Sequence, residues 1–416
     1  MRRRVTTTGA VGIGVGSMLG AGVFVVWGPA ANLAGRFLMV ALAIAALVAL
    51  ANALSTAQLA ARYPEAGGAF AYGTRELGPA WGFLAGAGFL VGKTASVAAL
   101  GLALGVLVAP AWAAAVATGA VMASWALNAR GVTRTAAAAI VLAVATVGAL
   151  LWIGFRLRQV SPLAQAIADV ETAPASISPW SVLAAAGMLF FAFAGYARIA
   201  TLGEEVRNPA RTIPRAIMFA FVLVVAVYVW VGTGLQSHYG ARALGSVSEP
   251  LPRFLDAHAG VVLGIAVPAA AIAGAMLALT AGVGRTAMAM ARAGELPRLL
   301  ADTNGHGVPA RAEALSAAAA IVLIWNGDLR LAISLSAFAV LVYYAIANLA
   351  AARQSRGGRT TSFSVSRWVS FAGAAGCLLM AASLPFGAVV IGVIAGSALM
   401  AGRQFIWRRR GMSDVP

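Results

Sequence analysis

The stretch that decides the fold is Gly12-Ile13-Gly14-Val15-Gly16-Ser17-Met18-Leu19-Gly20-Ala21-Gly22-Val23-Phe24, an apolar segment with five glycines in eleven positions. Each glycine weakens a helix by roughly 1 kcal/mol relative to alanine. A membrane helix is interrupted only where the freed main-chain groups are buried in protein or line a cavity. Two interpretations fit. Either the helix is interrupted and presents N–H groups to a carboxylate, or it is continuous and Gly12, Gly16 and Gly20 pack closely on a neighbour.

The composition of the whole chain places this segment in a membrane. Of the 416 residues, 61% are hydrophobic and 10% are charged, whereas a soluble domain is about 25% charged. One span needs about 20 apolar residues. The sequence therefore predicts an all-α polytopic membrane protein with about twelve transmembrane helices, at roughly residues 9–32, 37–61, 81–108, 111–128, 133–154, 180–200, 214–236, 259–290, 312–326, 330–352, 367–384 and 386–405.

The net charge of +17 does not indicate a nucleic-acid partner. The cations lie in short loops between apolar runs and form no continuous basic face with interleaved aromatic residues. With the N-terminus inside, most of the 30 Lys and Arg residues fall in segments on the inner side, as the positive-inside rule requires. We therefore expect a multi-pass protein of the cell membrane with both termini in the cytoplasm.

A second candidate interruption lies in the sixth predicted span. Residues 188–198 read MLFFAFAGYAR, and the polar run EEVRNP follows at residues 204–209. Two interrupted spans five helices apart are typical of an inverted five-plus-five repeat. Phe190, Phe191 and Phe193 either wall a pocket, in which carbonyls near Ala192 and Ala194 receive an ammonium, or pack against neighbouring helices.

Lys93 is the only lysine in the chain and lies about a dozen residues inside the third predicted span. An ammonium in the middle of a membrane costs about 2.5–3.5 kcal/mol on insertion scales. Every acidic residue falls in a loop or at a span end, so no carboxylate is expected beside Lys93. It is either a proton-coupling amine, a fixed positive group near the solute path, or a side chain that snorkels towards water.

Charged residues also gather at the predicted cytoplasmic rim. Glu204, Glu205, Arg207 and Arg285 either form an inner gate of salt bridges or are solvated surface charges, for which isolated pairs contribute about 0–1 kcal/mol.

Four blocks of the sequence resemble the amino acid–polyamine–organocation transporter superfamily, in particular its amino acid permeases. They keep their order and spacing over about three quarters of the chain. The blocks are GAGVF at residues 20–24, YPEAGG at 63–68, FFAFAG at 190–195 with EEVRNP at 204–209, and GRTAMAMARAGELP at 284–297.

The resemblance implies the leucine-transporter-type fold in a single domain. Helices 1 and 6 are interrupted, residues 1–154 and 180–352 form the two repeats of five helices, and residues 367–405 form helices 11 and 12. It also implies that the carboxylate of an α-amino acid meets the main chain of Gly20, Ala21 and Gly22, while the amino group meets the interruption that ends at Gly195. Many relatives carry a hydroxyl where this chain has Ala21, so backbone donors do more of the work or Ser17 contributes. Phe191 matches an aromatic lid.

The expected function is secondary active transport of amino acids by alternating access, coupled to protons or to an exchanged solute. No nucleotide-binding loop, metal site or cofactor motif is present in the sequence. The lack of a carboxylate within the spans favours neutral, apolar amino acids. The alternative is a cationic amino acid or polyamine antiporter, in which the solute stacks on Phe191 or Phe193. An intramembrane enzyme is less favoured because all three histidines lie in predicted loops, and a channel or sensor is the remaining class.

Overall fold

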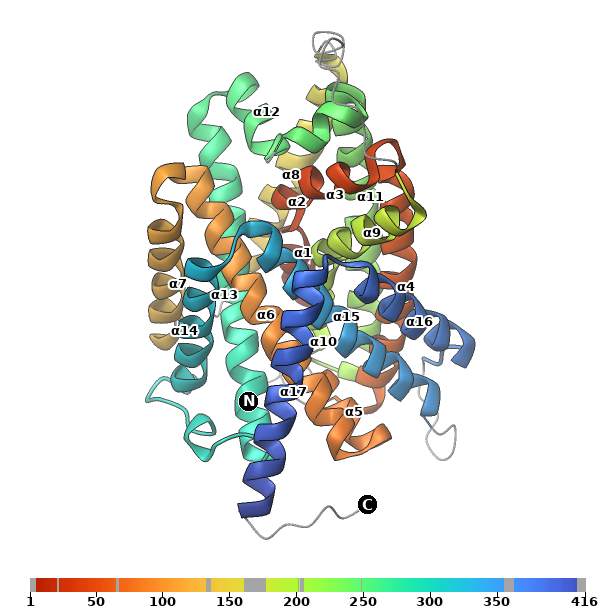
Figure 1. The fold of residues 1–416 in the computed structure, drawn as a ribbon, viewed down its shortest axis with the longest axis vertical. Coiled ribbons are helices and arrows are strands. Elements are labelled where there is room, and N and C mark those ends of the chain that lie inside the picture. The colour runs from red at the N-terminus through yellow and green to blue at the C-terminus, as the bar shows by residue number, and fades with distance from the viewer. Residues whose placement is uncertain are drawn as a thin grey trace.

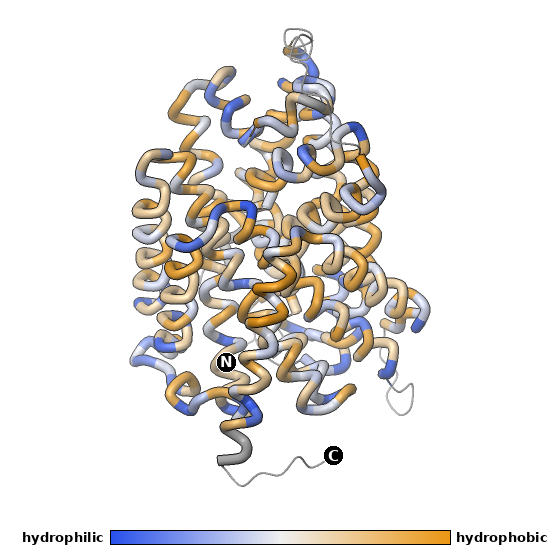
Figure 2. Tube along the Cα trace, viewed as in Figure 1, coloured by the Kyte–Doolittle hydropathy of each residue, from blue (hydrophilic) through white to orange (hydrophobic). Residues whose placement is uncertain are grey.

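The computed structural model describes residues 5–20, 22–64, 67–131, 136–160, 177–200, 202, 206–247, 249–354 and 363–409. The described chain is a bundle of helices (Figure 1). Hydrophilic residues gather at the two ends of the bundle, and hydrophobic residues occupy the length between them (Figure 2). Ten helical segments in the described part are long and apolar enough to cross a membrane. The protein is therefore a multi-pass membrane protein.

The helices follow the predicted spans closely and add two short ones. They are α1 (Thr7–Leu19), α2 (Gly22–Val25), α3 (Trp27–Ala34), α4 (Leu38–Arg62), α5 (Ala69–Leu77), α6 (Pro79–Val108), α7 (Ala113–Ala129), α8 (Ala136–Gln159), α9 (Pro179–Phe193), the 3-10 turn η4 (Ala194–Tyr196), α10 (Ala197–Ala200), α11 (Pro209–Ser246), α12 (Pro250–Ala259), α13 (Val261–Arg292), α14 (Ala310–Asn326), α15 (Leu329–Arg353), α16 (Arg367–Ser383) and α17 (Phe386–Arg409).

Several helices begin where a polar side chain caps the first turn. The Ser178 hydroxyl accepts a hydrogen bond from the N–H of Ser181 at the start of α9, and Pro179 occupies the first helical position. The Asp328 carboxylate accepts the N–H of Leu331 at 2.7 Å at the start of α15. These caps satisfy N–H groups that would otherwise lack a partner at the helix end.

Helices α5 and α12 lie in segments that contain no predicted span. They mark opposite ends of the bundle, with α5 at the end that also carries the last turns of α17 (Figure 1).

α14 and α16, which match two predicted spans, are 17 residues long and fall outside the ten membrane-length segments. The first and sixth predicted spans are each divided, into α1, α2 and α3 and into α9, η4 and α10.

Helix α6 runs through the centre of the bundle. It packs along α15 and α13 and also contacts α5, α7, α14 and α17. Of the interrupted helices, α1 contacts α8, α11 and η4, while α9 contacts α3, α4, α15 and α16. Large apolar side chains such as Leu47, Val141, Phe219 and Val262 point outward, as expected for a surface that faces lipid.

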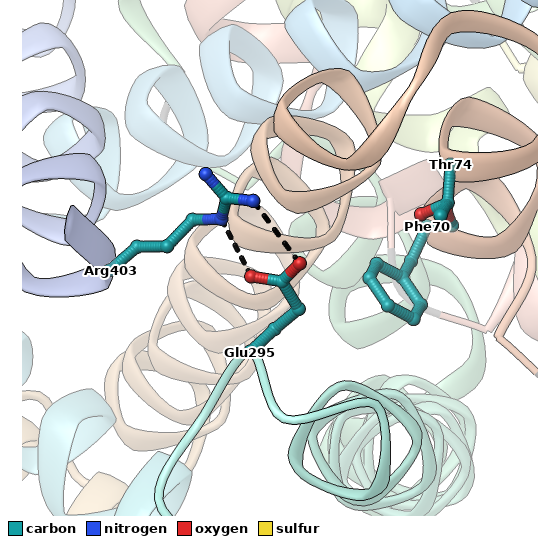
Figure 3. A network of polar contacts seen from close by, with 4 residues as sticks. All are labelled: Phe70, Thr74, Glu295 and Arg403. Carbon is teal, nitrogen blue, oxygen red and sulfur yellow. Dashed lines mark hydrogen bonds and ion pairs between the residues drawn. The ribbon is translucent and has the colours of Figure 1, made fainter. Parts of the chain in front are cut away.

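A buried ion pair ties the last helix to the rest of the bundle (Figure 3). Arg403 Nε of α17 lies 2.6 Å from Glu295 Oε2 in the loop after α13, and both side chains are 5–6% exposed. The Arg403 guanidinium also lies 5.6 Å from the ring centroid of Phe83 in α6. Phe70 of α5 packs on Phe83 in the same region. The pair therefore joins α17, α13 and α6 at the α5 end.

We expect Glu295→Gln to destabilise the protein by about 3–5 kcal/mol, because it leaves the Arg403 charge buried without its carboxylate. Asp302→Asn is the matched control, since the Arg311–Asp302 pair is 3.1 Å apart but 59–67% exposed. The second change should have little effect. Denaturant or thermal unfolding in detergent measures both. Equal shifts for the two variants would contradict a structural role for the buried pair, whereas Glu295→Gln combined with Arg403→Met should recover much of the loss.

Candidate functional site

The two helix interruptions lie in direct contact. α1 ends at Leu19 and α2 begins at Gly22, while α9 gives way to η4 after Phe193. A methyl group at Gly22 would overlap the main chain of Ala192, and one at Gly195 would overlap the main chain of Ser17. Glycine is required at both positions because only a hydrogen fits between the two chains. The contact thus joins segments about 170 residues apart (Gly22 and Ala192).

The glycine-rich segment is packed closely in its first half and divided between two helices in its second half. α1 runs without a break through Gly12, Gly14 and Gly16, and Gly12 and Gly14 pack against Ile140 of α8 and Ile199 of α10. α1 ends at Leu19 with Gly20 as its C-cap, and α2 begins at Gly22. Ala21 lies outside the described residues, so its predicted contact with a solute stays a prediction.

Two side chains from other helices bind the carbonyl groups at the interruptions. The Tyr228 hydroxyl of α11 lies 2.9 Å from the carbonyl oxygen of Met18 and 2.9 Å from that of Ala192. Its single proton is therefore shared between the last turn of α1 and the last turn of α9. Lys93 Nζ of α6 donates to the carbonyl oxygen of Ala194 at 3.1 Å. Both side chains are buried.

The predicted aromatic residues of the sixth span face different neighbours. The Phe190 ring meets Tyr344 of α15 edge-on at 5.8 Å between centroids, and the Phe193 ring meets Tyr228 edge-on at 5.0 Å. Phe191 lies between them in sequence and is 7% exposed. Phe190 and Phe193 therefore pack against helices on either side of α9, and the role of Phe191 as a lid stays a prediction.

A cavity lies beside the interruptions, towards the α5 end. The paired rings of Tyr343 and Tyr344, 4.2 Å apart, form part of its wall. α4, α5, α6, α10, α15 and the turn before α5 supply the lining, which consists of Thr56, Gly67, Gly68, Ala69, Tyr72, Phe89, Ala197, Ala200, Tyr343, Tyr344 and Ala347. Phe89 and Ala197 stand one turn from Lys93 and Ala194 respectively. The cavity therefore reaches to within about one helical turn of the contact between the interruptions.

The remaining predicted residues lie at the edge of this region or beyond it. Ser17 is partly exposed, and its hydroxyl donates to the Ile13 carbonyl at 2.7 Å. Glu204 and Glu205 lie outside the described residues. Arg207 is exposed, with its backbone N–H bound to the Val5 carbonyl, and Arg285 is partly buried in α13. The inner gate stays a prediction. In the described part of the chain, no group of three His, Cys, Asp or Glu residues could hold a metal ion.

Tyr228 and Tyr344 are the site residues that sequence reasoning missed. Tyr228 stands alone in the apolar run of α11, and no local pattern sets it apart from a packing residue. The adjacent pair Tyr343 and Tyr344 carries two hydroxyls into an apolar span, which was the one available signal.

The fold and the site define a multi-pass α-helical membrane protein with two interrupted helices in contact. Residues 9–402 match the family described as amino acid permease. The chain is 44% identical over 431 aligned positions to an uncharacterized transporter of Mycobacterium tuberculosis, covering all of this chain and 94% of that protein. It is 27% identical over 318 positions to a branched-chain amino acid permease of Bacillus subtilis, covering 68% and 66%. It is 26% identical over 360 positions to the vacuolar cationic amino acid transporter 2 of Arabidopsis thaliana, covering 79% and 56%.

The chain belongs to the amino acid permease family. This confirms the resemblance drawn from the four sequence blocks. The family and these relatives are transporters rather than enzymes.

We expect Gly22→Ala and Gly195→Ala each to force the interrupted helices apart. The added methyl group meets main-chain atoms that cannot move without the helix, and overpacking of this kind costs typically about 1–3 kcal/mol. Gly282→Ala in α13 is the matched control, because it is buried yet has no atom within 4 Å of an added methyl group. Thermal unfolding in detergent should show lower Tm for the first two and an unchanged or higher Tm for the control. Site variants as stable as the control would show that the two chains are not in contact.

Proposed function

We propose that the protein is a secondary active amino acid transporter that works by alternating access around the two interruptions. The observation that carries this proposal is the contact of Gly22 with Ala192 and of Gly195 with Ser17. Main-chain groups at both interruptions are brought to one place inside an apolar bundle. A solute with one carboxylate and one ammonium can use N–H donors from one interruption and carbonyl acceptors from the other.

The proposed site uses the main chain of Gly20, Ala21 and Gly22 for the carboxylate, with help from the Ser17 hydroxyl. The ammonium is received by carbonyls of the sixth-span interruption. Tyr228 already donates to Ala192, but a carbonyl oxygen has two lone pairs and can accept the ammonium as a second donor. The Ala194 carbonyl accepts Lys93, so the ammonium uses the carbonyls on the Ala192 side of the interruption. The protein's own donors therefore stabilise these carbonyl groups and leave a lone pair for the solute.

We infer a twelve-span arrangement of two inverted repeats, with α14 and α16 as the shorter spans. The lengths and order of α1 to α8 and of α9 to α15 support this pairing, because each half begins with an interrupted helix. The excess of Arg residues in the segments expected inside supports cytoplasmic termini at the cell membrane. Movement of one repeat against the other would then open the site to each side in turn.

Neutral, apolar amino acids are the favoured substrates. α1, α6, α9, α11, α13 and α15 contain no Asp or Glu, so none of these six helices offers a carboxylate to a cationic side chain. The Bacillus relative is named for branched-chain amino acids. A cationic amino acid or polyamine antiporter is the second candidate, because the Arabidopsis relative is named for cationic amino acids.

Coupling to protons or to an exchanged solute is proposed for the driving force. Lys93 is the candidate coupling residue, because its amino group contacts one interruption directly.

Reconstituted protein should take up at least one neutral amino acid in a saturable way. Uptake should be stimulated either by an inward proton gradient or by preloading the vesicles with unlabelled amino acid. Proteoliposomes tested with the twenty amino acids measure this, with protein-free liposomes as the control. No uptake under any condition would contradict the proposal. Uptake insensitive to both driving forces would indicate a channel, and preference for arginine, lysine or polyamines would favour the second candidate.

A further inference from the structure

Lys93 places a buried amino group at the contact between the interruptions. It lies near the midpoint of α6, is 4% exposed, and its Nζ donates to the Ala194 carbonyl at 3.1 Å. The next residue after Ala194 is Gly195, which packs on the main chain of Ser17. Lys93 therefore reaches the proposed amino-acid site itself and does not snorkel to the surface.

The amino group has more donors than the described protein fills. An ammonium carries three N–H donors, and Ala194 is its hydrogen-bond partner in the described residues. Within the described residues Lys93 forms no ion pair with a carboxylate, and the pairs Arg311–Asp302 and Arg403–Glu295 do not include it. A buried charge without a counter-ion is unfavourable. A solute that brings a carboxylate to this place would supply the missing partner.

A solute with a net positive charge is repelled by the Lys93 ammonium. At an effective dielectric constant of about 20, two like charges about 6–8 Å apart repel by an energy equivalent to roughly 30- to 100-fold in affinity. Helices α1, α6, α9, α11, α13 and α15 hold no acidic residue that would offset this repulsion. The buried Glu313 of α14, which packs on α6, lies against Gly284 of α13. The carboxylate of a cationic amino acid offsets one positive charge, but its side chain adds another.

Resting on the proposed function, we propose that Lys93 is a charge filter, a specificity-determining residue that helps bind the substrate carboxylate and excludes amino acids with a net positive charge. The substrate class is therefore amino acids with zero or negative net charge. With this filter, a single side chain distinguishes a transporter of neutral amino acids from a transporter of cationic amino acids or polyamines. The names of the relatives do not distinguish these two candidate functions.

The test is a comparison of affinities in the purified full-length protein. Dissociation constants are measured for the twenty amino acids and ornithine with wild type, Lys93→Met and Lys93→Arg. Methionine keeps much of the length of the side chain without its charge, and arginine keeps the charge. We expect wild type to bind every cationic amino acid at least about 30-fold more weakly than the best neutral one. In Lys93→Met that ratio should fall at least tenfold, with a gain of cationic binding, while Lys93→Arg should retain it.

A gain of binding cannot result from misfolding, so the expected outcome is separate from loss of structure. Wild type that binds lysine or arginine as well as a neutral amino acid would overturn the filter without any variant. An unchanged ratio in Lys93→Met would overturn it too. If neutral amino acids bind but the ratio of neutral to cationic affinity differs from the expected one, the charge filter is contradicted. The proposed transport function then still stands. If wild type binds no amino acid, the proposed function fails and the filter falls with it.

Discussion

The structure depends on one constraint, which is that main-chain N–H and C=O groups inside a membrane must find hydrogen-bond partners within the protein. An uninterrupted helix meets this constraint by itself, but α1 and α9 do not continue as regular helices. The protein compensates by pressing the two interruptions together at Gly22 and Gly195 and by supplying the hydroxyl of Tyr228 and the amino group of Lys93. Helices α6 and α11 are thereby fixed around the same place as α1 and α9.

This arrangement explains why the site combines rigid and replaceable contacts. The glycine contacts are steric, and no solute can substitute for them. The hydrogen bonds from Tyr228 and Lys93 are polar contacts to carbonyls that retain a free lone pair. In the proposed mechanism a bound amino acid adds donors and acceptors to main-chain groups that Tyr228 and Lys93 stabilise, so binding requires no large rearrangement of the main chain. The cavity lined by Tyr343 and Tyr344 brings the α5 end of the bundle close to this place.

Local sequence patterns predicted the helices and marked the two interruptions as candidates, because apolar length and glycine content act through neighbouring residues. Local patterns could not predict contacts between segments that lie far apart in the sequence. Tyr228 meets Met18 across 210 positions of sequence and Arg403 meets Glu295 across 108, and neither residue differs locally from a packing residue or a loop cation. α5 and α12 were missed for another reason: they are 9 and 10 residues long and lie outside the apolar runs. Lys93 was singled out because a lone cation in an apolar run is costly wherever it lies.

An experimental structure of the protein with its transported amino acid bound tests the central claim most directly. We expect the amino acid between the Gly20–Gly22 segment and the turn η4, within hydrogen-bond distance of main-chain atoms of both. An amino acid bound elsewhere, with α1 continuous through Gly22 and α9 continuous through Gly195, would contradict it.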